Sequence, residues 1–152
     1  MLYLTGIHAL HVPCSLDTNG VPKIPEVDWK TVNFVESSEM FFGDYGIEYN
    51  VHIPEHKDKV CVANHIRACL DLLAMGKLDE AEGMSQFIGN AEYDKEIFDK
   101  VYMMKVLPHW KEIEHFMDIE YRINWIYFKD HMRQLEKEEW KRTRMTTLLK
   151  SL

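Results

Sequence analysis

Two groups of histidine and cysteine residues have spacings that could support metal binding or thiol chemistry. The first group, in the stretch "GIHALHVPC" (6–14), places His8, His11 and Cys14 three residues apart. Each of these side chains can bind zinc, which in a structural site takes four ligands. The spacing matches neither C-x2-C nor H-E-x-x-H, and Pro13 argues against a helix that continues through Cys14. The stretch permits a zinc site, although we favour structural residues in a loop.

The second group lies further along the chain, in a segment whose apolar spacing predicts a helix over 59–77. Cys61, His65 and Cys69 occupy positions i, i+4 and i+8 of that segment, so on a helix they form one row. Such a row could hold a metal through His65, or use Cys61 as a nucleophile with His65 as its base. Free cysteines on an apolar helix are more often small core residues. Packing, catalysis and metal binding therefore all stay open here.

A third stretch, "MFFGDYGIEY" (40–49), combines a glycine-rich turn with aromatic and acidic side chains. Its candidate binding residues are Phe41, Phe42, Asp44, Tyr45 and Glu48. Aromatic side chains on a loop are frequent hot spots of protein interfaces. The alternative is that the rings pin their own loop to the core. We predict a protein-binding loop at this position.

The charge balance limits the classes of partner. Acidic residues outnumber basic ones 25 to 18, and the net charge is −7. Duplex-binding proteins usually carry a basic stripe, whereas only the last dozen residues here are basic, so no direct binding of nucleic acid is expected. The acidic first half instead fits a larger protein partner with a basic, nucleic-acid-binding groove. Signatures of nucleotide-binding loops, dinucleotide folds and hydrolase nucleophile elbows do not occur.

The compartment can also be inferred from the sequence. Three cysteines cannot all pair in disulfides, and the first residues lack the basic region of a signal peptide. No apolar run approaches the ~20 residues that span a bilayer. We therefore expect a cytoplasmic protein with free thiols and no membrane association, and no cofactor other than the zinc considered above.

These residues are carried by a chain whose two parts differ in composition. Residues 1–59 hold four of the five prolines and predict loops with short strands at 1–5, 31–35 and 47–53, the last with an apolar period of two. Residues 60–152 predict helices. We expect a single α+β domain over 1–152, helix-dominated, with the strands packed on a C-terminal helical bundle.

Three further helices are expected after the one over 59–77. They cover 78–89, 94–105 and a long periodic run that begins at Pro108 and includes apolar residues to Leu135. A break near 142–147 is expected because threonines cluster there. The aromatic face of the long run could be core, or it could be a surface for self-association.

The quoted segments "TGIHALHVPCSLDT", "FGDYGIE" and "VANHIRACLDLL" resemble uncharacterised small bacterial proteins of mobile elements. The resemblance implies a mobile-element or host-defence setting, in which small inhibitors, antitoxins and anti-defence (anti-CRISPR-like) proteins are common. It assigns no activity and no site residue. Our hypothesis is a small acidic inhibitor that docks on a larger protein through the loop around 41–48. The alternative is a small enzyme or zinc protein that uses His8, His11, Cys61 and His65.

Overall fold

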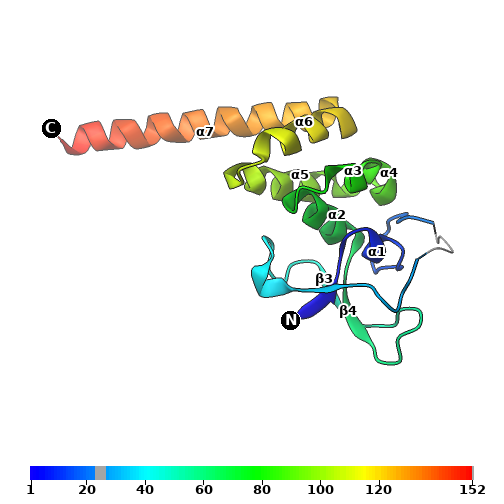
Figure 1. Cartoon of the computed structure of the whole chain (residues 1–152). Helices are drawn as coiled ribbons and strands as arrows, with labels where there is room; N and C mark the ends of the chain where they lie inside the picture. The colour runs from blue at the N-terminus through cyan, green and yellow to red at the C-terminus, as the bar shows by residue number, and fades with distance from the viewer. Residues whose placement is uncertain (23–26, 152) are drawn as a thin grey trace.

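A small four-stranded sheet lies on one side of a stack of helices (Figure 1). The computed structural model describes residues 1–22 and 27–151. The strands are β1 (Leu2–Leu4), β2 (Phe34–Glu36), β3 (Ile47–Val51) and β4 (Val60–Ala63), in the spatial order β2-β1-β4-β3. The central pair β1 and β4 is parallel and the outer pairs are antiparallel. The predicted strands at 1–5, 31–35 and 47–53 are confirmed with shifted ends, and so is the helix-dominated α+β class.

The helices follow mostly after the sheet. They are α1 (Gly6–Leu10), α2 (His65–Ala74), α3 (Leu78–Ala81), α4 (Met84–Ile88), α5 (Asp94–Met103), α6 (Trp110–Glu120) and α7 (Ile123–Lys150), with short 3-10 turns at Ser37–Glu39, Ala91–Tyr93 and Met104–Val106. The single helix expected over 78–89 is two helices, because Gly83 adopts a left-handed backbone between them. The loops expected between the strands at 1–5 and 31–35 include residues 23–26, which lie outside the described residues.

The prediction of one helix over 59–77 is wrong in its first turn. Residues 60–63 form β4 at the centre of the sheet, which suits the β-branched Val60 and Val62. Helix α2 starts only after Asn64, whose side chain accepts a hydrogen bond from the Arg67 amide as an N-cap. Cys61 is therefore on a strand, and the predicted row of Cys61, His65 and Cys69 does not exist.

The long C-terminal periodicity also belongs to two helices. Arg122 has a positive φ of 57°, and the chain turns there between α6 and α7. The turn lets Asp118, near the end of α6, accept hydrogen bonds from Trp125 Nε1 at 3.0 Å and Lys129 Nζ at 2.9 Å. The expected break near 142–147 is absent, because α7 continues to Lys150.

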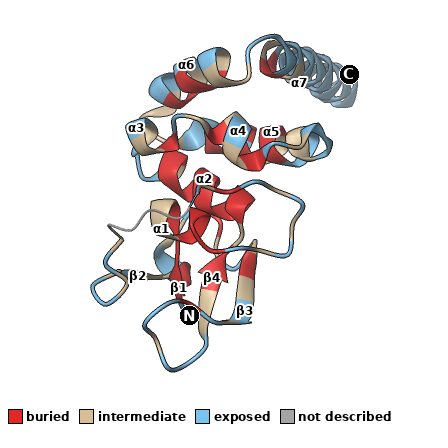
Figure 2. Ribbon diagram, turned by 90° about the vertical axis from the view of Figure 1, so that its right-hand side faces the viewer, coloured by how far each residue is buried: buried red, intermediate tan, exposed pale blue. Residues whose placement is uncertain are grey.

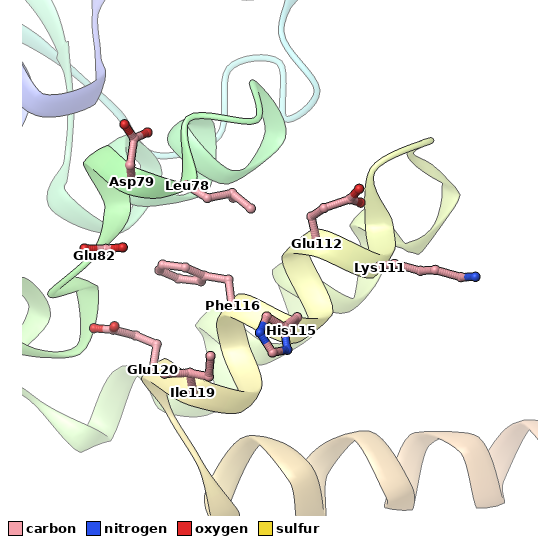
Figure 3. A pocket seen from close by; sticks show the side chains of 9 residues that line it. All are labelled: Leu78, Asp79, Glu82, Lys111, Glu112, His115, Phe116, Ile119 and Glu120. Carbon is pink, nitrogen blue, oxygen red and sulfur yellow. The ribbon is translucent and has the colours of Figure 1, made fainter.

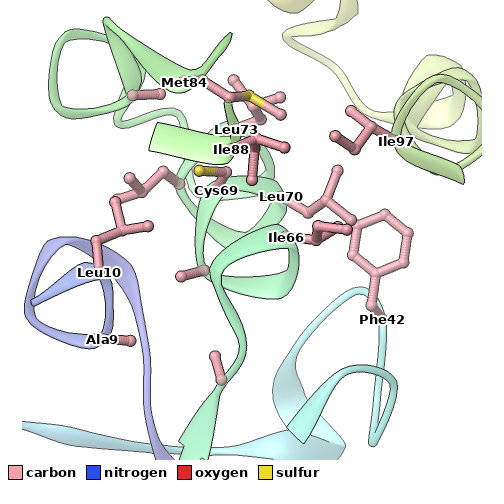
Figure 4. Packing of buried hydrophobic residues seen from close by; sticks show 14 of the residues in the cluster. Ala9, Leu10, Phe42, Ile66, Cys69, Leu70, Leu73, Met84, Ile88 and Ile97 are labelled. Carbon is pink, nitrogen blue, oxygen red and sulfur yellow. The ribbon is translucent and has the colours of Figure 1, made fainter. Parts of the chain in front are cut away.

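The core runs from the sheet through α2 to the C-terminal helices. Figure 4 shows α1, α2, α4, α5 and the loop before β3 contributing apolar side chains to it. The residues labelled there are all buried: Ala9, Leu10, Phe42, Ile66, Cys69, Leu70, Leu73, Met84, Ile88 and Ile97. By contrast, the second half of α7 extends past this body and is exposed on all sides (Figures 1 and 2). Among the described helices, none is long and apolar enough to cross a membrane.

Candidate functional site

Helix α2 carries a buried ion pair that organises the loop before β3. Arg67 and Asp71 are both fully buried, and Arg67 Nε lies 2.8 Å from Asp71 Oδ1. The two residues are four positions apart on the helix, so their side chains meet on one face. The hydroxyls of Tyr3 and Thr5 each donate to Asp71 Oδ2 at 2.6 Å. The carboxylate is thus fully bonded, as a buried charge requires.

The same arginine holds the predicted binding loop in place. Its Nη1 donates to the carbonyl oxygens of Gly43 and Tyr45 at 2.7 and 2.5 Å. The Tyr45 hydroxyl donates to Glu96 on α5 at 2.5 Å, and Lys100 of α5 lies over the Tyr45 ring. Burial and the bond with Glu96 raise the pKa of Tyr45. These contacts fasten the loop to the body from both sides.

The other predicted binding residues divide between core and surface. Phe42 is buried, whereas Phe41 packs edge-on against it and is exposed. Glu48 accepts hydrogen bonds from the Ser15 amide and hydroxyl, so its carboxylate holds the loop that follows α1. Asp44 is exposed. The pinned-loop alternative describes these contacts, and binding by the loop stays an untested prediction.

An acidic groove between α3 and α6 is a site that the sequence did not suggest. It encloses about 720 Å³ and is lined by apolar and charged side chains: Leu78, Asp79, Glu82, Lys111, Glu112, His115, Phe116, Ile119 and Glu120. Figure 3 shows side chains of the two helices facing each other across it, with Lys111 extending away from α3. Ile119 is 61% exposed at the groove, while Phe116 is buried in its floor. The groove therefore offers apolar contact surface among carboxylates.

The loop that follows α1 folds onto the N-terminus of α2. This segment, which we call the first loop, contains Val12, Cys14 and Thr18 and contacts His65. This histidine is buried, with 3% of its surface exposed. Its Nδ1 lies 2.7 Å from Thr18 Oγ1 and its Nε2 lies 2.7 Å from the Val12 carbonyl oxygen. Cys14 Sγ lies 3.5 Å from the same Thr18 oxygen. Two hydrogen bonds through the Thr18 hydroxyl thus link Cys14 to His65. The cysteine close to this imidazole is Cys14, not the predicted Cys61.

The surroundings of Cys14 favour its thiolate form. Burial alone would raise the pKa, but interactions with His65 and Thr18, and with the backbone at His65 and Leu16, lower it from 9.0 to about 7. The His65 pKa responds in the opposite sense. Burial lowers it, but the neighbouring Cys14 sulfur and the Val12 carbonyl outweigh burial and raise it. Both shifts therefore favour the state in which Cys14 is a thiolate and His65 is protonated.

The remaining predicted ligands are only partly brought together. His11 lines the same cavity as Cys14 and His65, whereas His8 lies on α1, where burial lowers its pKa. Cys61 is half-buried on β4. No group of three or more His, Cys, Asp or Glu side chains is placed to hold a metal ion among the residues that the structure describes. Zinc binding stays an untested prediction.

Comparisons with known proteins found no counterpart. No protein-family model, no curated protein and no solved structure matches this chain. Its fold and sites therefore have to be interpreted from their own chemistry.

Proposed function

We propose that this protein binds a larger protein partner and that the groove between α3 and α6 is its docking surface. The observation that carries this proposal is Ile119, a large apolar side chain that is 61% exposed beside the Phe116 floor. An exposed apolar patch rimmed by polar residues is typical of an interaction site. The groove thus replaces the loop around 41–48 as the favoured surface.

The charges around the groove select the kind of partner. Four carboxylates line it, from Asp79, Glu82, Glu112 and Glu120, against one lysine. Glu120 already accepts hydrogen bonds from the Ser85 amide and hydroxyl, but Asp79, Glu82 and Glu112 are exposed. Opposite charge on the partner would speed its encounter with this acidic groove, and repulsion would exclude acidic partners. The occupant is therefore an amphipathic segment that presents apolar residues to Ile119 and lysine or arginine to the rim.

A partner of this kind fits the acidic balance of the whole chain, whose net charge is −7. Basic amphipathic segments are common in proteins that bind nucleic acid, because phosphate contacts need lysine and arginine. Covering such a segment would block the partner's own contact with nucleic acid. The protein would then act as an inhibitor, in keeping with the mobile-element or anti-defence setting that the sequence resemblance implies.

A designed peptide pair tests the proposal without the natural partner. The probe is a fluorescein-labelled amphipathic helix of leucine and lysine, and its counterpart replaces every lysine with glutamate. When the protein is added, we expect the fluorescence anisotropy of the lysine peptide to rise and that of the glutamate peptide to stay unchanged. The affinity for the lysine peptide should fall as the salt concentration increases. Amide chemical shifts should change around Phe116 and Ile119. Equal binding of both peptides, or shift changes confined to other surfaces, would exclude the groove.

Two pairs of variants make the test specific. Burial of an isoleucine contributes roughly 1.5–3 kcal/mol, so Ile119→Ser should weaken binding by about tenfold or more. Its control is Ile123→Ser, because Ile123 is similarly exposed but lies outside the groove. Glu82→Gln should weaken binding and flatten its salt dependence, whereas Glu138→Gln on the exposed part of α7 should change neither. Matching losses in the control variants would refute the assignment.

A further inference from the structure

A small cavity lies between the first loop and the start of α2, and it contains Cys14. The cavity encloses about 200 Å³, and its polar lining includes His11, Cys14, Thr18 and His65. Cys14 is half-buried, so its sulfur is partly open to small molecules, whereas Cys69 is buried in the core. The cavity shares no lining residue with the groove between α3 and α6.

The hydrogen bonds in this cavity define a path for the Cys14 proton. His65 Nε2 faces the Val12 carbonyl oxygen, which can only accept, so Nε2 carries a hydrogen. In the neutral ring, Nδ1 then accepts from the Thr18 hydroxyl, whose oxygen is free to accept the thiol hydrogen of Cys14. When the proton moves, both bonds reverse: Nδ1 donates to Thr18 and Thr18 donates to the thiolate. Neither protonation state loses a hydrogen bond.

His11 provides independent evidence that the cavity takes a ligand. Its side chain is only 6% exposed, and its Nδ1 has no hydrogen-bond partner among the described residues. A buried polar atom without a partner costs about 1–3 kcal/mol, and such atoms are rare in native proteins. A polar group of a molecule bound in the cavity beside Cys14 would supply the missing bond.

We propose that Cys14 is the nucleophile of a thiol–disulfide exchange site that accepts low-molecular-weight disulfides. The Cys14 proton passes to Thr18 as the Thr18 proton passes to His65 Nδ1. The thiolate attacks one sulfur of the small disulfide, a new S–S bond forms to Cys14, and the other half leaves as a thiolate. The proton on His65 returns through Thr18 to that leaving sulfur. The mixed disulfide keeps a polar group near His11 and is reversed by added thiol.

The charged and titratable groups around Cys14 come from three elements. His65 belongs to α2, His11 follows α1, and Glu48 belongs to β3 and accepts from Ser15, next to Cys14. The Glu48 carboxylate also raises the pKa of His65, so it supports the protonated imidazole. A pH profile of Cys14 reactivity therefore reports on this set and not on the thiol alone.

The test measures alkylation of Cys14 by iodoacetamide in the full chain with EDTA, followed by peptide mass spectrometry. At pH 7, a thiol with a pKa of about 7 is about half ionised, whereas a thiol with a pKa of 9.0 is about 1% ionised. The lower pKa also makes each thiolate about eightfold less nucleophilic, which offsets part of the roughly fiftyfold gain in ionised thiol. Native Cys14 should therefore react about sixfold faster than the same residue in urea-unfolded protein. Thr18→Val should reduce this advantage and move the midpoint of the rate profile upward, because it removes one of the interactions that lower the Cys14 pKa. The control Thr31→Val alters an exposed threonine outside the cavity and should leave the midpoint near 7.

The exchange itself is tested with hydroxyethyl disulfide as the probe. We expect one hydroxyethylthio group on Cys14, removed again by dithiothreitol. His11→Leu should lower the adduct yield at a fixed ratio of disulfide to thiol, whereas Thr31→Val should not. A rate midpoint at 8.5 or above, equal behaviour of Thr18→Val and Thr31→Val, or adducts found mainly on Cys61 would overturn the proposal. Thermal melts of each variant identify any that fail to fold, and the remaining variants then decide the outcome.

Discussion

Removal of one charge from the buried pair of α2 should destabilise the protein far more than removal of an exposed charge. Arg67 is fully buried and donates to Asp71, Gly43, Tyr45 and Tyr3. Arg67→Met would leave the Asp71 carboxylate buried without its cation and two carbonyl oxygens without a donor. Breaking a buried pair in this way costs roughly 3–5 kcal/mol. For a chain of this size, that corresponds to a fall in Tm of about 10 °C.

The chain offers a matched control with the same sequence spacing. Lys95 and Asp99 on α5 also form an i,i+4 pair at 2.9 Å, but the Lys95 side chain is 83% exposed. Exposed pairs of this kind contribute about 0.3–0.5 kcal/mol, so Lys95→Met should be nearly neutral. The double variant Arg67→Met/Asp71→Leu removes both charges and should lose less stability than the two single variants added together.

Urea denaturation followed by circular dichroism measures these differences, and hydrogen exchange gives a second readout. Arg67→Met should speed exchange in the loop at 43–46, because the arginine no longer binds its carbonyl groups. A loss below about 1 kcal/mol for Arg67→Met, comparable to that of Lys95→Met, would contradict the buried network as described.

Three further altered proteins test the C-terminal half. Tyr121→Phe should be neutral or slightly stabilising in urea denaturation, because the Tyr121 hydroxyl is buried without a partner among the described residues and its removal relieves that cost. The same variant should reduce the stability loss above pH 10: burial raises the Tyr121 pKa, so the unfolded chain ionises first as pH rises. Truncation after Glu139 should shift Tm by no more than about 2 °C, since the removed part of α7 is exposed. Glu136→Gln should flatten the acid limb of the stability profile, because Lys105 lowers the Glu136 pKa and this contribution is lost as pH falls below 4.5.

The sequence predicted the fold class and most element types because apolar periodicity reports directly on burial. The alternation over 47–53 became β3, and the long run after Pro108 became α6 and α7. Two errors came from tertiary context. The residues of β4 look helical when read together with α2, and only pairing with β1 and β3 makes them a strand. The turn at Arg122 depends on a positive φ that no glycine signals.

The candidate sites were harder to predict because they depend on contacts between distant segments. His65 and Cys14 were each singled out as a possible metal ligand, but nothing in the spacing joined residues 51 positions apart. Thr18 was missed altogether, since a threonine in a turn-rich stretch carries no chemical signal. The groove was missed for the same reason: Asp79 and Ile119 are ordinary helix residues until the fold brings α3 and α6 to the two sides of one groove.

The polar side chains of α2 explain why histidine, arginine and aromatic residues in the sequence did not indicate the proposed binding surface. His65 holds the first loop, while Arg67 and Asp71 hold the loop before β3 and the start of the chain. Irregular loops satisfy only part of their backbone groups by themselves, so the remaining buried groups need donors and acceptors from a rigid helix. Arginine, histidine and aromatic residues supply those contacts, and their spacing therefore marks where loops are fastened. The surface left free to bind is formed instead by common residues of α3 and α6, so Ile119 and its carboxylate neighbours are the residues to alter first.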